Sequence, residues 1–195
     1  MAIDTGQCGS CADRVLPASF DRCVVAVDYV YPWDGLVARF KFRQQPGWAG
    51  PLAQLMLRSP DVARLLRHAD AVVPVPLTQR RLADRGYNQA WELVKALRRA
   101  ALRRRLRSPP GLPQGLLRMA ETPDQHSLPR SARLHNLSGV LSANPVHRAV
   151  LAGRHVLVVD DVTTSGATLE AAAHALKQAG ARTVSALAFA RTPHA

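Results

Sequence analysis

The feature that most constrains the fold is the segment from Val156 to Thr168, which reads Val-Leu-Val-Val-Asp-Asp-Val-Thr-Thr-Ser-Gly-Ala-Thr. Its first four residues are apolar and partly β-branched, which predicts a buried strand of a parallel sheet. Apolar residues at positions 169, 172, 173 and 176 then recur at helical spacing, and they predict a helix that begins at about Thr168. A strand, a short polar turn and a helix are the repeating unit of an α/β fold.

The turn inside this segment has the composition of an anion-binding site. Backbone N–H groups and the positive end of the helix dipole converge there. Gly166 lets the backbone approach an anion closely, and hydroxyl donors come from Thr163, Thr164, Ser165 and Thr168. Asp160 and Asp161 would repel a phosphate but suit the vicinal hydroxyls of a sugar. The turn therefore suits a sugar phosphate. The alternative is an ordinary turn whose hydroxyls cap the helix and whose aspartates face water.

The rest of the chain extends this unit into an α/β fold with a central parallel sheet. Further strands are expected over residues 24–30, 69–75 and 183–190. Helices are expected over 36–41, over 52–66 with an interruption at Pro60, from about 89 to 106, and over 169–179 with Gly180 as the C-cap. Residues 47–50 are expected to break the chain, and residues 108–147 show little periodicity, as in a long functional loop.

A second basic turn follows the predicted strand 69–75. Arg80, Arg81 and Arg85 come after the sequence Pro74-Val-Pro-Leu-Thr78, and guanidinium groups bind phosphate oxygens in pairs. Ligands of parallel sheets gather at the C-terminal ends of the strands, so this turn and the acidic pair are expected to face each other. The alternative is that the prolines stiffen a turn, Asn88 caps the next helix and the arginines are solvated.

The segment 117–141 alternates arginines with turn-forming residues. Arg118, Arg130 and Arg133 suit a lid over an anionic leaving group, and the alternative is a solvated loop.

Taken together, these segments resemble the competence protein F (ComF) family of the type I phosphoribosyltransferase superfamily. The resemblance runs from about Cys8 to Thr192. Its residues are Pro74 to Leu77, Arg81, Arg85, Gly86, Tyr87, Asn88 and Gln89, then Arg118, Thr122, Gln125, Leu128, Arg130, Arg133 and Asn136, with Tyr29, Lys41 and Phe42 upstream. It implies a central parallel sheet flanked by helices, with a zinc-ribbon remnant over 1–23, an N-terminal hood over 24–68 and a phosphoribosyltransferase core over 69–195.

The resemblance also implies a substrate, phosphoribosyl pyrophosphate (PRPP), and a pentosyl transfer that releases pyrophosphate. Asp160 and Asp161 would hold the ribose hydroxyls, and Arg118 would help to stabilise the leaving group. The 5′-phosphate loop would be Val162, Thr163, Thr164, Ser165, Gly166, Ala167 and Thr168, and the pyrophosphate side would be Val75, Pro76, Arg80, Arg81, Arg85 and Asn88. Mg²⁺ would be held mainly by substrate oxygens. The sequence names no acceptor.

The cysteines depart from the family pattern, which often begins with zinc ribbons. Cys8 and Cys11 form one Cys-x-x-Cys pair, while Cys23 stands alone and no histidine precedes His68. Structural zinc needs four ligands, so we expect no complete zinc site within this chain. A remnant of a half-ribbon, or a chain whose earlier residues are missing, would account for the pattern.

A net charge of +12 favours polyanionic partners. Much of it lies between Arg98 and Arg107, either as a solvated helical face or as a nucleic-acid surface. Because the resembled family is associated with DNA uptake, an alternative function is a non-catalytic PRPP sensor or scaffold acting on single-stranded DNA. A regulator that binds a nucleotide monophosphate is a third possibility. No apolar run is long enough to cross a bilayer and no secretion signal is evident, so a cytoplasmic location is expected.

Overall fold

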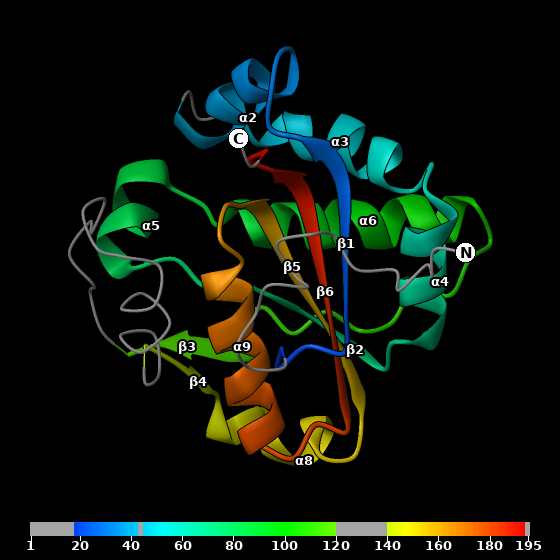
Figure 1. Cartoon of the computed structure of the whole chain (residues 1–195), viewed down its shortest axis with the longest axis vertical. Helices are drawn as coiled ribbons and strands as arrows, with labels where there is room; N and C mark the ends of the chain where they lie inside the picture. The colour runs from blue at the N-terminus through cyan, green and yellow to red at the C-terminus, as the bar shows by residue number, and fades with distance from the viewer. Residues whose placement is uncertain (1–17, 43–44, 120–139, 194–195) are drawn as a thin grey trace, which may run out of the picture.

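The computed structural model describes residues 18–42, 45–119 and 140–193. Its centre is a four-stranded sheet of β1 (Arg22–Asp28), β6 (Thr183–Arg191), β5 (His155–Thr163) and β2 (Ala71–Pro74), in that order. All neighbours are parallel (Figure 1), with Arg22 opposite Ser185, Val156 opposite Val184 and Ala71 opposite Val156. The predicted parallel α/β sheet is confirmed.

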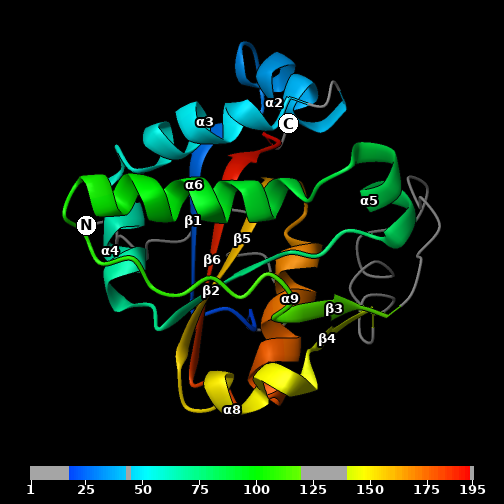
Figure 2. The same cartoon turned by 180° about the vertical axis from the view of Figure 1, so that it is seen from behind.

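Helices cover both faces of the sheet. On one face lies α9 (Ala167–Gln178), and on the other lie α3 (Ala49–Met56), α4 (Pro60–His68) and α6 (Gln89–Arg103), as Figures 1 and 2 show from opposite sides. Successive residues of β5 serve the two cores in turn: Val156 and Val158 pack toward α9, and Leu157 and Val159 toward α3 and α6. Burial on both faces explains why this strand is apolar without alternation.

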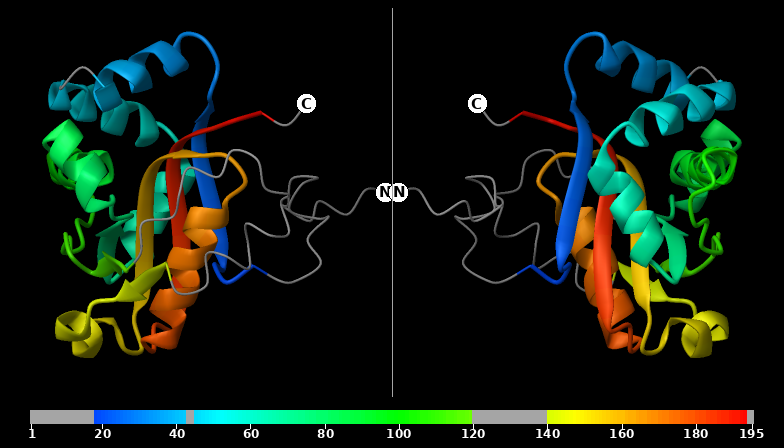
Figure 3. Two further views of the ribbon diagram at one scale, coloured as in Figure 1. Left: turned by 90° about the vertical axis from the view of Figure 1, so that its left-hand side faces the viewer. Right: turned by 90° about the vertical axis from the view of Figure 1, so that its right-hand side faces the viewer.

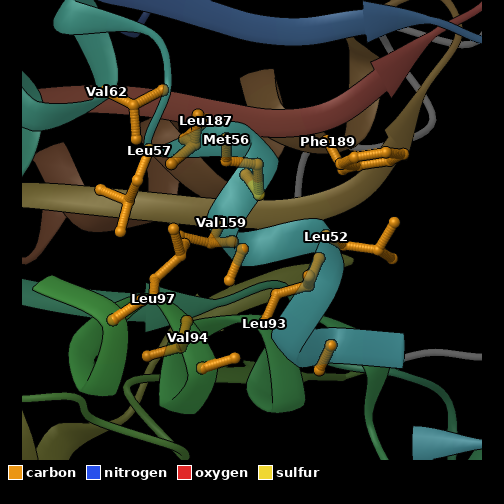
Figure 4. Packing of buried hydrophobic residues seen from close by; sticks show 14 of the residues in the cluster. Leu52, Met56, Leu57, Val62, Leu93, Val94, Leu97, Val159, Leu187 and Phe189 are labelled. Carbon is orange, nitrogen blue, oxygen red and sulfur yellow. The ribbon is translucent and has the colours of Figure 1, made fainter. Parts of the chain in front are cut away.

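The core under α3 and α6 combines residues from distant parts of the chain. Leu52 and Met56 of α3 meet Leu93 and Leu97 of α6 over Val159 of the sheet (Figure 4), and all five side chains are buried. This packing fixes α6 along the sheet and thereby places the turn that precedes it at the C-terminal ends of the strands.

Helix α2 (Trp33–Phe42) lies at the C-terminal end of the sheet (Figures 1 and 3). It is anchored by Val37 and Phe40, which are fully buried, and by an edge-to-face contact of Trp33 with Phe189, whose ring centroids lie 6.1 Å apart. This anchoring brings the last turn of α2 over the end of β5.

Several sequence-based expectations need correction. Residues 47–50 do not simply break the chain: Pro46–Trp48 form a 3₁₀ turn, η1, and Gly50 lies inside α3. The turn expected after β2 contains a helix, α5 (Gln79–Arg85), whose N-cap Thr78 accepts a hydrogen bond from the Arg81 N–H at 3.2 Å. Both errors concern short elements whose periodicity is too brief to detect.

The segment expected to be one long loop, 108–147, holds regular structure at both ends. A two-stranded antiparallel sheet joins β3 (Leu116–Arg118) to β4 (Leu141–Ala143), followed by η2 (Pro145–His147) and α8 (Arg148–Leu151). Residues 110–112 also pair with the edge of β2, where the Val72 N–H donates to the Pro110 carbonyl at 2.9 Å.

The three-part division at residues 23 and 68 stays a prediction. The sheet itself contains residues of all three parts, because β1 crosses the boundary at residue 23 and pairs with β6 from Arg22 to Asp28. None of the helices in the described ranges is both long enough and apolar enough to cross a membrane.

Candidate functional site

The acidic pair lies within the last part of β5 rather than in the turn that follows it. Asp160 and Asp161 continue the strand, which stays paired with β6 as far as Thr163. The Asp160 Oδ1 atom accepts the Asp161 N–H at 2.8 Å, and Asp161 Oδ1 accepts the Val162 N–H at 2.7 Å. Both carboxylates are therefore held by the backbone, although successive side chains of a strand leave it on opposite faces.

Asp161 forms an ion pair with a residue of α2. The Lys41 Nζ atom lies 3.1 Å from Asp161 Oδ1, and the two side chains are 19% and 10% exposed. The ammonium therefore neutralises one of the two adjacent carboxylates. In the sequence only the family resemblance points to Lys41, because its contact with the acidic pair depends on the packing of α2 over the sheet.

Asp160 carries an unfavourable charge. Burial, followed by repulsion from Asp161, raises the pKa of Asp160 to about 7, and the charge of Lys41 only partly opposes this. A carboxyl group that titrates near neutral pH is typical of a site that awaits a ligand, since hydroxyl donors or a cation would restore its charged form.

The predicted phosphate loop has the expected backbone geometry. Gly166 is the N-cap of α9 with φ of 79°, a left-handed conformation that suits glycine, and Ser165 Oγ accepts the Ala167 N–H at 3.4 Å. The helix begins at Ala167, one residue before the predicted start. Thr164 is exposed, and Ser165 and Thr168 are half-buried, so their hydroxyls border the amide groups of the first turn. This arrangement can bind an anion.

Arginines from two other elements converge on the acidic pair. Arg118 of β3 is half-buried; burial lowers the pKa of its guanidinium, the charge of Arg81 lowers it further, and the charge of Asp160 raises it. Burial likewise lowers the pKa of Arg85, while Asp161 raises it. These interactions indicate that Arg118 and Arg85, which is one of the three arginines predicted for the pyrophosphate side, lie near the carboxylates. Arg118, however, lies on a strand and not in the expected loop.

The position of Arg85 is set by its neighbours at the start of α6. Its Nη1 atom donates to Gln89 Oε1 at 3.0 Å, and its guanidinium lies 5.0 Å from the ring centroid of Phe42, on α2. Gln89 is 1% exposed, and its Nε2 atom has no hydrogen-bond partner within the described ranges. Tyr87 donates a hydrogen bond to the Phe40 carbonyl. Two contacts thus join the turn before α6 to α2.

Asn88 has a clear structural role. Its Oδ1 atom accepts the Trp91 N–H at 3.3 Å as the N-cap of α6, and its Nδ2 atom donates to the Val75 carbonyl at 3.0 Å. The capping alternative is therefore confirmed for this residue. Asn88 also ties α6 to the end of β2, which fixes Val75 and Pro76 beside the site. Arg80 and Arg81 are exposed on α5.

The arginine run on α6 and beyond is partly structural. Arg98 donates to the Pro109 carbonyl at 2.7 Å, Arg104 to the Leu57 carbonyl at 2.6 Å and Arg107 to the Arg67 carbonyl at 2.9 Å. Arg99, Arg103 and Arg105 are exposed. The run is thus neither wholly a solvated face nor wholly an open nucleic-acid surface.

Some predicted residues lie outside the described ranges. They are the candidate zinc ligands Cys8 and Cys11, and the residues Thr122, Gln125, Leu128, Arg130, Arg133 and Asn136 of the expected lid. Cys23 lies exposed on β1. No cluster of three or more His, Cys, Asp or Glu side chains suited to a metal ion occurs within residues 18–42, 45–119 and 140–193. The prediction about zinc stays untested.

Comparisons with known proteins agree with this geometry. Residues 120–195 match the family "Phosphoribosyl transferase domain", a range that includes the acidic pair and the phosphate loop. The DNA utilization protein YhgH of Escherichia coli O6:H1 is 34% identical over 189 residues, which cover 95% of this chain and 78% of that protein. Competence protein F of Haemophilus influenzae Rd is 32% identical over 188 residues, with the same coverage.

A solved structure is also similar in part. It is the glutamine PRPP amidotransferase of B. subtilis, in complex with ADP and GMP, at 24% identity and a TM-score of 0.41. The match covers 76% of this chain but only 26% of the amidotransferase chain.

Proposed function

Because the chain belongs to the family of competence protein F and DNA utilization protein YhgH, and has the type I phosphoribosyltransferase fold, we propose that it binds PRPP with Mg²⁺ and transfers the phosphoribosyl group to an acceptor. The observation that carries this proposal is one arrangement at the end of β5. There a backbone-held acidic pair leads into a glycine-capped anion loop, with Arg85 and Arg118 close to the carboxylates.

Asp160 and Asp161 would accept hydrogen bonds from the ribose hydroxyls. The anomeric carbon loses its bond to the pyrophosphate oxygen, which keeps the electron pair, and gains a bond to the acceptor, which gives up a proton. The ribose becomes positively charged in the transition state, so two neighbouring carboxylates favour it electrostatically.

The loop from Val162 to Thr168 would hold the 5′-phosphate. Its amide groups are fixed at the start of α9, and Thr164, Ser165 and Thr168 add hydroxyl donors without moving the backbone. An anchor on this non-reacting group orients the anomeric carbon, which is an entropic contribution to the rate.

Arg81, Arg85 and Arg118 would receive the leaving pyrophosphate. Arg81 lies on α5, Arg85 at the end of α5 and Arg118 on β3. Burial, with added repulsion from Arg81, lowers the pKa of both Arg85 and Arg118, and a bound anion would oppose this effect. This cluster is therefore arranged to stabilise negative charge that grows as the bond breaks.

The residues present fit Mg²⁺ only as an ion that arrives with the substrate. Asp161 already has Lys41 as its cation, and Asp160 has a raised pKa, so the pair alone is a poor hard-cation site. When bound by PRPP oxygens, Mg²⁺ would neutralise charge on the pyrophosphate. Asp160 is the carboxylate available to it.

Calorimetric titration of PRPP with Mg²⁺ tests the proposal. The wild type should bind, and the double variant Asp160→Asn, Asp161→Asn should lose at least tenfold in affinity. The matched control Asp28→Asn, Asp84→Asn removes two exposed carboxylates and should bind like the wild type. A well-folded wild type that fails to bind PRPP would overturn the proposal. If the wild type does bind PRPP, acceptors can be screened by the release of pyrophosphate.

A role in DNA handling is the second candidate. It is supported by the names of the two relatives, DNA utilization protein and competence protein, and by the exposed arginines of α6. Affinity for single-stranded DNA should fall steeply with salt, and Arg99→Gln with Arg103→Gln should reduce that slope. A slope identical to that of the wild type would show that α6 has no part in DNA binding.

A cytoplasmic location also stays a prediction.

A further inference from the structure

A basic pocket lies at the N-terminal edge of the sheet, at the opposite end of the strands from the acidic pair. Its volume is about 390 Å³, which is within the range of small-ligand pockets. Its lining includes Arg22, Arg64, His68, His155, Arg182 and Ser185. These residues come from α4 and from the starts of β1, β5 and β6. The starts of these strands lie at the lower end of the sheet in Figure 1.

Strand register explains why these side chains meet. Ser185 is opposite both Arg22 of β1 and Leu157 of β5, and Leu157 faces the core beneath α4. His155 is two residues before Leu157, so its side chain leaves the sheet on the same face. Its Nε2 atom lies 2.9 Å from Ser185 Oγ. The last turn of α4, with Leu65 and His68, closes the pocket.

The charges around the pocket do not cancel. Asp61 Oδ1 is shared by the Arg22 Nη2 atom at 2.9 Å and the Arg64 Nη1 atom at 3.3 Å, so one carboxylate faces two guanidinium groups. Asp21 is paired with Lys177 at 2.9 Å and accepts the Val184 N–H at 2.7 Å. Arg182 has no carboxylate partner within the part of the chain that the structure describes.

The character of the lining indicates which chemical group would bind. Guanidinium, imidazole and hydroxyl groups dominate it; among the described residues Asp21, which is paired with Lys177, is its one carboxylate and Leu65 its one aliphatic member. None of the described residues that line it is a Phe, Tyr or Trp on which a base could stack. Such a lining recognises a phosphate through charge-assisted hydrogen bonds rather than a base through stacking.

Further arginines border the pocket on two sides. Arg107 donates to the Arg67 carbonyl, one residue before His68, and the Arg182 N–H donates to the Arg154 carbonyl at 2.9 Å. The Arg107 Nη2 atom also lies 3.4 Å from Asp70 Oδ1, so Arg107 is itself partly neutralised.

We propose that the pocket formed by Arg22, Arg64, His68, His155, Arg182 and Ser185 binds a phosphate group, as a second anion site separate from the loop after β5. The phosphate belongs either to a phosphorylated small molecule or to a nucleic-acid strand, since both present the same oxygens. This site does not depend on the proposed transferase activity.

Nuclear magnetic resonance of the histidine rings tests the site in the full chain. Signals of His68 and His155 are assigned with the variants His68→Gln and His155→Gln, and inorganic phosphate is then added. Both rings should shift in a saturable way, and Arg64→Gln with Arg182→Gln should weaken this binding at least tenfold. The control Arg39→Gln removes an exposed charge of α2, at the other end of the sheet, and should leave the ring shifts and the phosphate affinity as in the wild type.

Two further titrations distinguish the source of the phosphate. Ribose 5-phosphate represents a small molecule, and a 5′-phosphorylated single-stranded oligothymidylate represents a strand. If the oligonucleotide shifts the same rings and competes with inorganic phosphate, the source is nucleic acid; if only ribose 5-phosphate does so, it is a small molecule. Either result supports the phosphate site.

Other outcomes would overturn it. They are an absence of ring shifts with all three probes, equal shifts with chloride at the same ionic strength, or unchanged binding by Arg64→Gln with Arg182→Gln. Failure of the transferase proposal looks different, because it is a wild type that does not bind PRPP, and the residues tested there, Asp160 and Asp161, lie at the other end of the sheet. The ring shifts should be the same in that variant as in the wild type.

Discussion

The Lys41 ammonium lies 3.1 Å from the Asp161 carboxylate, so a helix from the N-terminal part of the chain supplies the counter-charge for the acidic pair. Helix α2 is held by Val37, Phe40 and Trp33, and none of these touches the pair itself. The ion pair therefore links the packing of α2 to the charge state of the site. A ribose or a cation that engages Asp161 would compete with Lys41 for the same oxygen.

Replacing Lys41 tests how much the fold depends on this counter-charge. Lys41→Met leaves two adjacent carboxylates without their cation, which should destabilise the fold by up to about 3 kcal/mol at pH 8. For a chain of this size each kcal/mol lowers Tm by about 2–4 °C. The loss should shrink at pH 5, where one carboxyl of the pair can bind a proton. Thermal unfolding at the two pH values measures both effects.

Lys95→Met is the matched control for Lys41→Met. The Lys95 Nζ atom lies 2.8 Å from Glu92 Oε1 one turn earlier on α6, with the side chains 32% and 20% exposed, and such i,i+3 helix pairs contribute less than about 1 kcal/mol. Equal losses in both variants would show that the pairing of Lys41 is only a surface contact.

Asp160→Asn is expected to stabilise the protein without its ligand. The pKa of Asp160 is raised from its ordinary value of 3.8 to about 7. Between pH 3.8 and about 7 the folded state therefore binds more protons than the unfolded chain. Stability is then fully present below the lower pKa and is lost as pH rises through the upper one. Asparagine carries no charge to be lost and can still accept the Asp161 N–H. Tm should therefore increase at pH 8 and match the wild type near pH 4.

The same comparison with Asp84→Asn, an exposed residue of α5, should show no such pH dependence. A decrease in Tm of Asp160→Asn at pH 8 would mean that the carboxylate is stabilised rather than strained in the folded protein. If Asp160→Asn has a higher Tm at pH 8 and also binds PRPP more weakly, the Asp160 carboxylate lowers the stability of the free protein and strengthens ligand binding.

Two substitutions of Asn88 can distinguish its structural role from a role in ligand binding. Asn88→Ala removes both the cap on Trp91 and the hydrogen bond to Val75, which should cost about 1–2 kcal/mol of stability. Asn88→Asp keeps the cap but cannot donate to the Val75 carbonyl, so it should recover only part of this stability. Asn144→Ala, which uncaps only the short η2 turn, should cost less. If Asn88→Asp is stable but binds PRPP tenfold more weakly, its amide also serves the ligand.

The sequence predicted the sheet well because its strands are buried on both faces. The apolar run 156–159 could be recognised as a strand without knowing which strand it pairs with. The helix after Gly166 could be predicted from the helical spacing of its apolar residues. The sequence did not predict that β5 continues through Thr163. Its last residues are polar, and only pairing with β6, where Val162 is opposite Ala190, makes them part of the strand.

Short elements near the site were missed for a related reason. Helix α5 has seven residues with none buried, and β3 has three, so neither has a periodic apolar face. Their structure depends on the Thr78 cap and on pairing with β4. The position of Arg85 near the acidic pair was expected from parallel-sheet topology, and Arg118 was expected there only as part of a lid. The pairing of Lys41 with Asp161 depends on tertiary packing that no local pattern encodes.

Gly166 and Gly180 offer a final test, because both have left-handed backbone conformations at the two ends of α9. Their φ angles are 79° and 95°, and alanine in such a conformation costs about 1–2 kcal/mol. Gly166→Ala and Gly180→Ala should therefore reduce the free energy of unfolding similarly. Only Gly166→Ala places a methyl group beside the amides of the phosphate loop, so it alone should weaken the binding of ribose 5-phosphate, measured by calorimetry, at least tenfold. Equal affinity in the two variants would contradict an anion site at this helix start.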